Sequence, residues 1–372
     1  MSVTQGYKLF SPFQLAKNLT LKNRVVLAPM TRSRAGADGV PNATMELYYK
    51  QRAGAGLLVT EATAVSEQGY GWNHTPALYN QKHVDGWRRI VDTLHEQNSA
   101  IFYQMWHLGR QGHPSFNAKG DLVAPSAIRL EHGTTRDVNL NEVAYVTPRA
   151  LETGEIPTII DDYRRSAELS LAAGFDGVEI HGGNGYLVDQ FLQSVTNKRT
   201  DKYGGSIENR ARFLLEIVEA LKTVLPSDRI GVRLSPNGGF GGMGSADNHE
   251  TFTYVMQRLS EHGLGYLAIL DGMGFGFHDL DKPLTALDAK VAFKGPVMAN
   301  CSYTRDIAEG ALRSGAADMV SFGRPFISNP DLTDRFQNDW PLSFGIQPEA
   351  LYNHALGAEG YSSYPGYKPA SE

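Results

Sequence analysis

The segment His181-Gly182-Gly183-Asn184-Gly185-Tyr186 carries the side chains best suited to acid–base chemistry in this 372-residue chain. Side chains three positions apart in a strand point to opposite faces, but two glycines allow the backbone to turn and bring His181 and Asn184 together. A neutral imidazole N–H and an amide NH2 can then bind one oxygen that gains negative charge, and Tyr186 can supply a proton. A single His or Tyr is more often structural, whereas three such groups at one glycine turn favour an active site.

Three more side chains are expected at the ends of buried strands. Gln104 and Trp106 share one face of their predicted strand, and Arg233 shares a face with Gly231 in another. Barrel enzymes build their active sites at the carboxyl ends of the strands. We therefore expect Gln104, Trp106 and Arg233 to point into the same site as His181.

A second group of residues has the pattern of a phosphate-binding site. Asn300 follows the seventh predicted strand, and residues 321–325, Ser-Phe-Gly-Arg-Pro, follow the eighth. Phosphate sites in barrels form at these two positions, where backbone N–H groups of a short helix and an arginine hold the anion. Arg324 is thus a candidate phosphate ligand. The alternative is a structural arginine that caps backbone carbonyls.

The elements that must position these groups alternate between strand and helix. Runs rich in Val, Ile and Leu recur at 24–29, 57–65, 100–107, 177–181, 229–234, 266–270, 296–299 and 319–322. Helical patterns lie between most of them, at 43–52, 84–97, 159–173, 209–221, 249–262, 304–314 and 330–336. This alternation predicts a parallel sheet, and eight strands are the number that closes a (β/α)8 TIM barrel. We predict an α/β fold with a single domain over residues 1–372.

Two segments are expected to depart from a plain barrel. The first twenty residues are predicted to form a short N-terminal hairpin that closes the barrel floor. The connection from 108 to about 157, after strand three, is too long for an ordinary barrel loop, and its length makes it a candidate cover for a substrate. A doubly wound dinucleotide fold is not supported, because Met30-Thr31-Arg32 stands where a Gly-x-Gly-x-x-Gly motif would begin.

Composition and charge restrict the partners. The chain has 35 Lys and Arg against 40 Asp and Glu, so no basic field for nucleic acid is expected. It has no apolar stretch of ~18 residues and no signal-peptide pattern, which predicts a cytoplasmic protein without a membrane span. The single cysteine, Cys301, cannot close an internal disulfide or ligate a four-cysteine iron–sulfur cluster. No metal site is predicted, because the histidines lack acidic companions at ligand spacing.

Six stretches of the chain carry motifs of a known family. They are Ala28-Pro29-Met30-Thr31-Arg32, Gln104-Met105-Trp106-His107-Leu108-Gly109-Arg110, 181–192, 197–206, Arg233-Leu234-Ser235-Pro236 and 323–332. Together they resemble the Old Yellow Enzyme family of FMN-dependent ene-reductases over nearly the whole chain. With Thr31 and Asn184 at these two positions, the chain resembles the branch of the family typified by the yeast and plant enzymes, which includes the 12-oxophytodienoate reductases.

The resemblance implies a (β/α)8 barrel that holds FMN without a covalent bond. NADPH or NADH would reduce the flavin and leave, as the electron donor. An α,β-unsaturated ketone, aldehyde or nitro-compound would then take hydride from flavin N5 at its β-carbon. The protein would act as a monomer or a homodimer.

The resemblance also implies the flavin-binding residues. Thr31 would bond the flavin O4, Gln104 would hold the pyrimidine edge, and Arg233 would lie near N1 and the C2 carbonyl. The remaining flavin contacts would come from the main chain at Pro29, Met30 and Ala62 along the ring, and from Asn300, Gly323 and Arg324 at the phosphate.

On the substrate side, the resemblance implies that His181 and Asn184 grip the carbonyl oxygen and that Tyr186 protonates the α-carbon. Walls of the pocket would come from Tyr70, Trp106, Phe240 and Tyr352. Two other readings stay open. A flavin-free barrel could act as a lyase or aldolase on a phosphorylated substrate, although the Schiff-base lysine or metal it needs is not apparent. A barrel could also bind the flavin with its chemistry lost, which the intact His181, Asn184 and Tyr186 disfavour.

Overall fold

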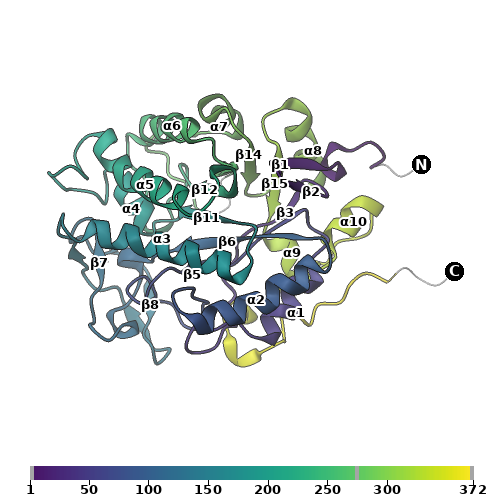
Figure 1. Ribbon diagram of the computed structural model, residues 1–372, viewed down its shortest axis with the longest axis horizontal. Helices are drawn as coiled ribbons and strands as arrows, with labels where there is room; N and C mark the ends of the chain where they lie inside the picture. The colour runs from purple at the N-terminus through teal and green to yellow at the C-terminus, as the bar shows by residue number, and fades with distance from the viewer. Residues whose placement is uncertain (1–3, 273–275, 369–372) are drawn as a thin grey trace.

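The computed structural model describes residues 4–272 and 276–368, and eight parallel strands close into a barrel (Figure 1). In chain order the barrel strands are β3 (Val25–Leu27), β4 (Leu57–Val59), β6 (Ala100–Trp106), β11 (Gly177–Gly182), β12 (Ile230–Leu234), β13 (Tyr266–Leu270), β14 (Val297–Asn300) and β15 (Met319–Phe322). Neighbouring strands pair in parallel, and the pairing of β15 with β3 closes the ring. The prediction of a (β/α)8 TIM barrel is confirmed.

The second predicted strand, 57–65, is wrong in its length. It divides into β4 and the two-residue β5 (Thr63–Ala64), and β5 also pairs with β6. The break has a local cause, because the hydroxyl of Thr60 accepts the backbone N–H of Gln104 at 2.9 Å in place of a carbonyl of the ladder. A second small correction concerns Asn300, which is the last residue of β14 and does not follow the strand.

Helices surround the barrel on its outer side (Figure 1). They are α1 (Ala43–Gln51), α2 (Gln81–His95), α3 (Ile156–Ala173), α4 (Leu187–Leu192), α5 (Ile207–Lys222), α6 (Asn248–Leu259), α7 (Ala286–Phe293), α8 (Arg305–Ser314), α9 (Arg324–Ser328) and α10 (Leu332–Asn338). The sequence analysis missed the short helix α4 and also α7, in which the hydrophobic periodicity is weak. A capping box between Thr285 and Asp288 begins this helix, and that pattern was readable in the sequence. None of the described helices is long and apolar enough to cross a membrane.

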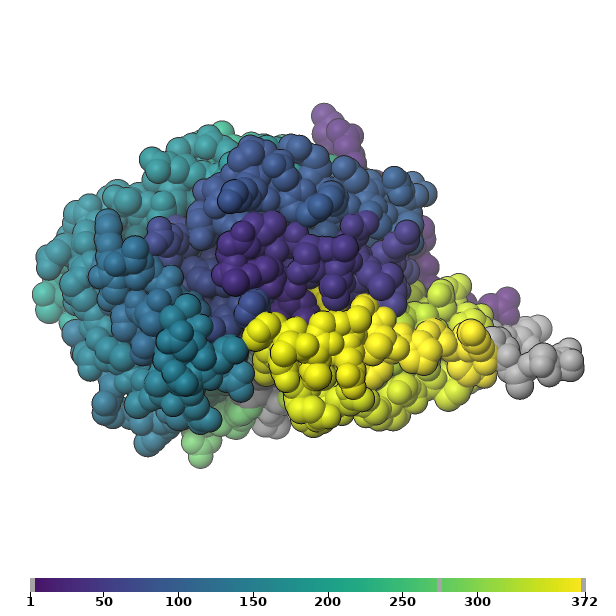
Figure 2. Space-filling model, turned by 90° about the horizontal axis from the view of Figure 1, so that it is seen from below, coloured from purple at the N-terminus to yellow at the C-terminus, as the bar shows by residue number. Residues whose placement is uncertain are grey.

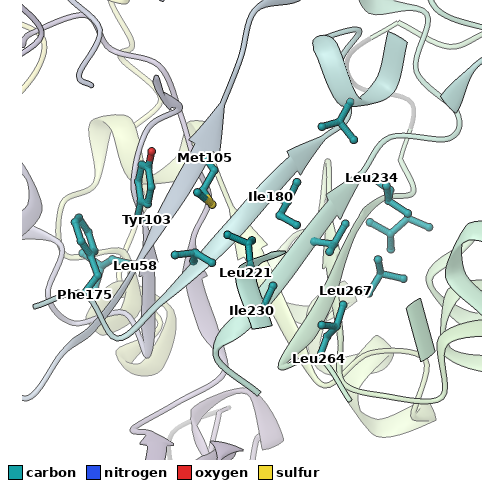
Figure 3. Close-up of a cluster of buried hydrophobic side chains, with 14 of the residues drawn as sticks. Leu58, Tyr103, Met105, Phe175, Ile180, Leu221, Ile230, Leu234, Leu264 and Leu267 are labelled. Atoms are coloured by element: carbon teal, nitrogen blue, oxygen red, sulfur yellow. The ribbon is translucent and has the colours of Figure 1, made fainter. Parts of the chain in front are cut away.

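The core has an outer and an inner layer. Ile180, Ile230 and Leu267 belong to the same cluster of buried side chains as Leu221 of α5, on the outer side of the barrel (Figure 3). Inside the barrel, the opposite strand faces form a separate cluster with Leu15 and Leu21, which belong to the antiparallel hairpin β1 (Phe13–Ala16) and β2 (Leu19–Leu21). The predicted N-terminal hairpin therefore exists, and its leucines join the apolar interior.

The predicted long excursion after strand three is also present. It contains the short strands β7 (Val123–Ala124), β8 (Thr134–Arg136), β9 (Glu142–Ala144) and β10 (Arg149–Ala150). β8 and β9 form an antiparallel hairpin, whereas β7 and β10 pair in parallel. The excursion is therefore a folded attachment to the barrel.

Candidate active site

A cavity of about 480 Å³ opens at the carboxyl ends of the barrel strands. It is lined by Ala28, Pro29, Met30, Thr31, Arg32, Ala62, Trp72, Gln104, Trp106, His181, Asn184, Tyr186, Arg233, Phe240, Asn300, Cys301, Ser302, Tyr303, Ser321, Phe322, Gly323, Arg324, Pro325, Ile327, Ile346, Leu351 and Tyr352. All the predicted site residues except Tyr70 are among them. Strand patterns together with the family resemblance thus identified one continuous site whose parts are up to about 300 positions apart in the chain.

The turn after β11 is not made by the two glycines at positions 182 and 183, as expected, but by the next two residues. Asn184 itself takes a left-handed conformation, with φ 55°, and Gly185 follows with φ 73°. Gly183 is needed for a close approach, because a Cβ there would lie 2.7 Å from the hydroxyl of Ser235. That hydroxyl accepts the backbone N–H of Asn184 at 2.7 Å, and the Asp189 carboxylate accepts that of Gly185 at 2.8 Å. These bonds hold Asn184 at the cavity wall.

His181 reaches the cavity as a neutral imidazole. Burial, together with the positive charge of Arg233, lowers the pKa of His181 well below its usual value. The backbone N–H of Gly183 donates to Nδ1 at 3.4 Å, so the ring proton belongs on Nε2. His181 therefore offers a neutral N–H donor to the cavity.

Tyr186 is fixed by two perpendicular ring contacts. Its ring centroid lies 5.1 Å from that of Trp106 and 4.9 Å from that of His181, with interplanar angles of 90° and 74°. Burial raises the pKa of Tyr186, so its hydroxyl carries a proton at neutral pH. The sequence-predicted acid thus lies beside His181, and Asn184 lines the same cavity.

Arg233 brings a buried positive charge to the floor of the cavity. One guanidinium nitrogen, Nη2, donates to Oδ1 of Asn300 at 2.9 Å, and the amide of Asn300 in turn donates to the carbonyl of Ser321 at 2.9 Å. The other nitrogen, Nη1, is buried without a hydrogen-bond partner among the described residues. A buried donor without a hydrogen bond costs free energy unless a ligand accepts one from it. We therefore expect a hydrogen-bond acceptor of a ligand next to Arg233.

The Thr31 segment is held from behind by a buried carboxylate. One oxygen of Glu61 accepts the backbone N–H groups of Arg32 and Ser33 at 3.0 and 3.2 Å. Burial raises the pKa of Glu61 to about 7, although these bonds and two arginines oppose the shift. The side chain of Thr31 lines the cavity just before this anchor.

The end of the cavity that is predicted to bind a phosphate contains residues that the sequence analysis missed. Cys301 and Ser302 follow β14 and have φ values of 95° and 63°, a backbone conformation that residues with side chains rarely adopt. They line the cavity with Gly323 and Arg324 at the end of β15. Their position directly after a barrel strand was the available signal.

One wall prediction needs correction. Tyr70 does not line the cavity, because its ring packs against Phe116, 5.9 Å away. Trp72 from the same loop lines it instead, in edge contact with Tyr352 at 5.7 Å. The excursion 108–157 contributes no residue to the lining, although the side-chain amide of Gln111 donates to the carbonyl of Asn184 at 2.8 Å, and its role as a substrate cover stays a prediction.

The C-terminal segment supplies one wall of the cavity, as predicted for Tyr352. Figure 2 shows this segment, in yellow, directly beside the purple N-terminal part of the chain. The guanidinium of Arg32 donates to the carbonyls of Leu351 and Gly360, and that of Arg34 to the carbonyls of Ala350 and Gly357. These bonds hold Leu351 and its neighbour Tyr352 at the cavity.

The lining suits a flat heteroaromatic ring with an anionic tail. Apolar groups from Pro29, Met30 and Ala62 lie along the cavity, Gln104 and the unpaired nitrogen of Arg233 offer polar contacts, and Arg324 lies at the phosphate-like end. A parallel eight-stranded barrel with such a site at its carboxyl end fits the class of barrel oxidoreductases that bind a flavin nucleotide.

Comparisons with known proteins agree. The sequence pattern of the NADH:flavin oxidoreductase / NADH oxidase family matches residues 8–343, and the chain belongs to this family, that of Old Yellow Enzyme. It is 37% identical over 359 residues to "Putative 12-oxophytodienoate reductase 11" of Oryza sativa subsp. japonica, covering 96% of this chain and 97% of that protein. It is 37% identical over 352 residues to "Probable flavin mononucleotide-dependent alkene reductase" of Leishmania infantum, covering 93% and 94%.

A solved structure shows the same fold. The Old Yellow Enzyme homologue from Zymomonas mobilis superposes with a TM-score of 0.91 at 39% identity, over 96% of this chain and 99% of that one. The protein is therefore an FMN-dependent oxidoreductase of the alkene-reductase type, with a nicotinamide nucleotide as electron donor.

Proposed function

We propose that the protein reduces the carbon–carbon double bond of α,β-unsaturated ketones, aldehydes and nitro-compounds. The observation that carries this proposal is the convergence of His181, Asn184 and Tyr186 on one cavity. Such a reduction needs two neutral hydrogen-bond donors, which bind the substrate oxygen, and a protonated phenol, which protonates the α-carbon.

His181 and Asn184 bind the substrate oxygen in this proposal. Donation from Nε2 of His181 and from the amide of Asn184 draws electron density away from the double bond. It also stabilises the negative charge that develops on the oxygen. Tyr186 delivers its proton to the α-carbon. FMN, when bound and reduced, supplies the hydride for the β-carbon.

The remaining cavity residues hold the cofactor, which we place in the cavity without a covalent bond. Thr31 and Gln104 bind the polar edge of the ring, and the unpaired nitrogen of Arg233 offsets negative charge that forms on reduction. The main chain at Pro29, Met30 and Ala62 covers the ring. Asn300, Gly323 and Arg324 form the phosphate end, where the side chain of Asn300 also orients Arg233.

The visible absorption spectrum of the purified protein tests the proposal. We expect a flavin band that bleaches anaerobically on addition of NADPH or NADH and returns on addition of cyclohexenone. A bleached band that stays bleached with enones, enals and nitroalkenes would contradict the proposed substrate class. A colourless protein that does not take up added FMN would contradict cofactor binding.

The lyase or aldolase alternative finds less support. No lysine is among the residues that line the cavity. Within the described part of the chain, no group of three or more His, Cys, Asp and Glu residues is placed to hold a metal ion. A Schiff base or a metal-bound enolate therefore has no partner there.

The aromatic pair Trp72 and Tyr352 leads to a prediction about substrate size. Replacing Trp72 by Ala removes one wall of the cavity, so kcat/KM for an enone with a bulky β-substituent should rise relative to cyclohexenone by about tenfold. Steady-state kinetics with both substrates measure this ratio. Tyr70→Phe is the matched control, because Tyr70 does not line the cavity, and its ratio should equal that of the wild type. An unchanged ratio in Trp72→Ala would contradict the proposed wall.

A further inference from the structure

A hydrogen-bonded polar layer lies inside the barrel at the floor of the cavity. Glu179 of β11 is fully buried at its centre. One carboxylate oxygen accepts the side-chain amide of Gln104 of β6 at 2.7 Å, and the other accepts the hydroxyl of Tyr266 of β13 at 2.8 Å. A carboxylate rather than an apolar residue is thus built into the barrel interior, directly beside a cavity-lining side chain.

The register of the barrel places these groups at one level. Gln104 is paired with Glu179 between β6 and β11, Glu179 with Gly231 between β11 and β12, and Gly231 with Tyr266 between β12 and β13. A Cβ at Gly231 would lie 2.4 Å from the ring of Tyr266. Only glycine at this position lets the phenol cross β12 and reach the carboxylate.

The charge of Glu179 has a counterpart closer to the cavity. Arg233 follows Gly231 by two positions on β12, so its side chain leaves the same face of the strand one layer nearer the cavity. Burial raises the pKa of Glu179, whereas Arg233 and the donors Tyr266 and Gln104 oppose that shift. Two donors to one carboxylate, with a guanidinium nearby, are the environment in which a buried carboxylate keeps its charge.

The carboxylate also determines which atom Gln104 presents. Because the amide nitrogen of Gln104 donates to Glu179, its oxygen is directed away from the carboxylate. Gln104 lines the cavity and is therefore able to accept a hydrogen bond from an N–H of a ligand there. With a neutral residue at 179, the amide could rotate and present its donors instead.

We propose that Glu179 is a positioning residue for FMN that lowers the reduction potential of the flavin. It acts by fixing the orientation of Gln104 and by partly neutralising Arg233. The net positive charge near the flavin is then smaller, so the negative charge of the reduced flavin is stabilised less. The proposal rests on the placement of FMN in the cavity, as argued above.

The test is the midpoint potential of FMN bound to Glu179→Gln, measured by anaerobic spectral titration against a reference dye. Replacing the carboxylate by an amide of equal size leaves Arg233 without its counter-charge, so the potential should shift to a less negative value. Glu208→Gln is the matched control, because it removes the same charge from an exposed position on α5, and it should have the wild-type potential. A wild-type potential in FMN-loaded Glu179→Gln would overturn the proposal.

Tyr266→Phe provides a second test that keeps the carboxylate. Removal of one donor should raise the pKa of Glu179 further. The potential should then approach that of Glu179→Gln as the pH falls and that of the wild type as the pH rises. A pH profile identical to that of the wild type would overturn the proposal. If the wild type itself bound no FMN, the proposed function would fail first, and the visible spectrum distinguishes that outcome from a potential that does not shift.

Discussion

Tyr186→Phe should reduce enones about 100-fold more slowly than the wild type, while its flavin is reduced by NADPH at nearly the wild-type rate. The phenol is the proton source in the proposed reaction, and burial raises its pKa, so the wild-type hydroxyl is protonated across the neutral range. Phenylalanine keeps the perpendicular contacts with Trp106 and His181, so the shape of the cavity should persist. Only the proton is lost.

Stopped-flow absorbance separates the two half-reactions of Tyr186→Phe. Enzyme reduced by dithionite and mixed with cyclohexenone reports the oxidative half, and oxidised enzyme mixed with NADPH reports the reductive half. Tyr70→Phe removes a hydroxyl from a tyrosine outside the cavity and should leave both rates unchanged. An equal loss in both half-reactions of Tyr186→Phe would contradict the assignment of Tyr186 as the proton donor.

His181→Ala should slow the oxidative half-reaction by about 100-fold or more, because it removes one of two donors to the developing oxyanion. Asn184→Ala should have an effect of similar size, and the double variant should lose less than the product of the two. The two side chains bind one oxygen and act as a unit. Stopped-flow rates with dithionite-reduced enzyme measure these losses independently of the nicotinamide. Wild-type rates in both single variants would contradict the oxyanion site.

The protonation state of His181 adds a pH prediction. An imidazolium donor would make the wild-type oxidative rate fall as the pH rises through about 6.5, the usual pKa of histidine. Because burial and Arg233 lower the pKa of His181, the imidazole stays neutral over this range, and we expect no such step between pH 6 and 8. His181→Asn keeps a neutral donor and should retain more activity than His181→Ala. A wild-type rate that follows the histidine titration would contradict the neutral donor.

The sequence by itself predicted which residues enter the site. Alternate residues of a strand share a face, and the carboxyl ends of parallel barrel strands meet at one edge. These two rules were sufficient to bring Gln104, Trp106 and Arg233 to the same cavity as His181. The glycine-rich turn at 182–185 signalled unusual backbone geometry, although the left-handed residues proved to be Asn184 and Gly185.

Errors in the sequence analysis fall where local pattern carries little information. The helix α7 lacks a clear apolar stripe, and only its capping box at Thr285 and Asp288 indicated where it begins. Trp72 and Tyr70 are two positions apart in one loop, and the sequence offered no means of choosing between them.

Only the tertiary structure showed which segments form the walls of the cavity and which buried charged groups lie near it. Arg32 binds the carbonyl of Gly360, 328 positions away, and that contact brings Tyr352 to the cavity. Glu179 binds Tyr266 across an intervening strand, which requires the glycine at position 231. Periodicity and strand parity are properties of neighbouring residues, and so the sequence determined the barrel and the candidate catalytic groups at its carboxyl end. Contacts between distant segments, and the buried charges that they bring together, depend on packing in three dimensions, and the folded chain determines them.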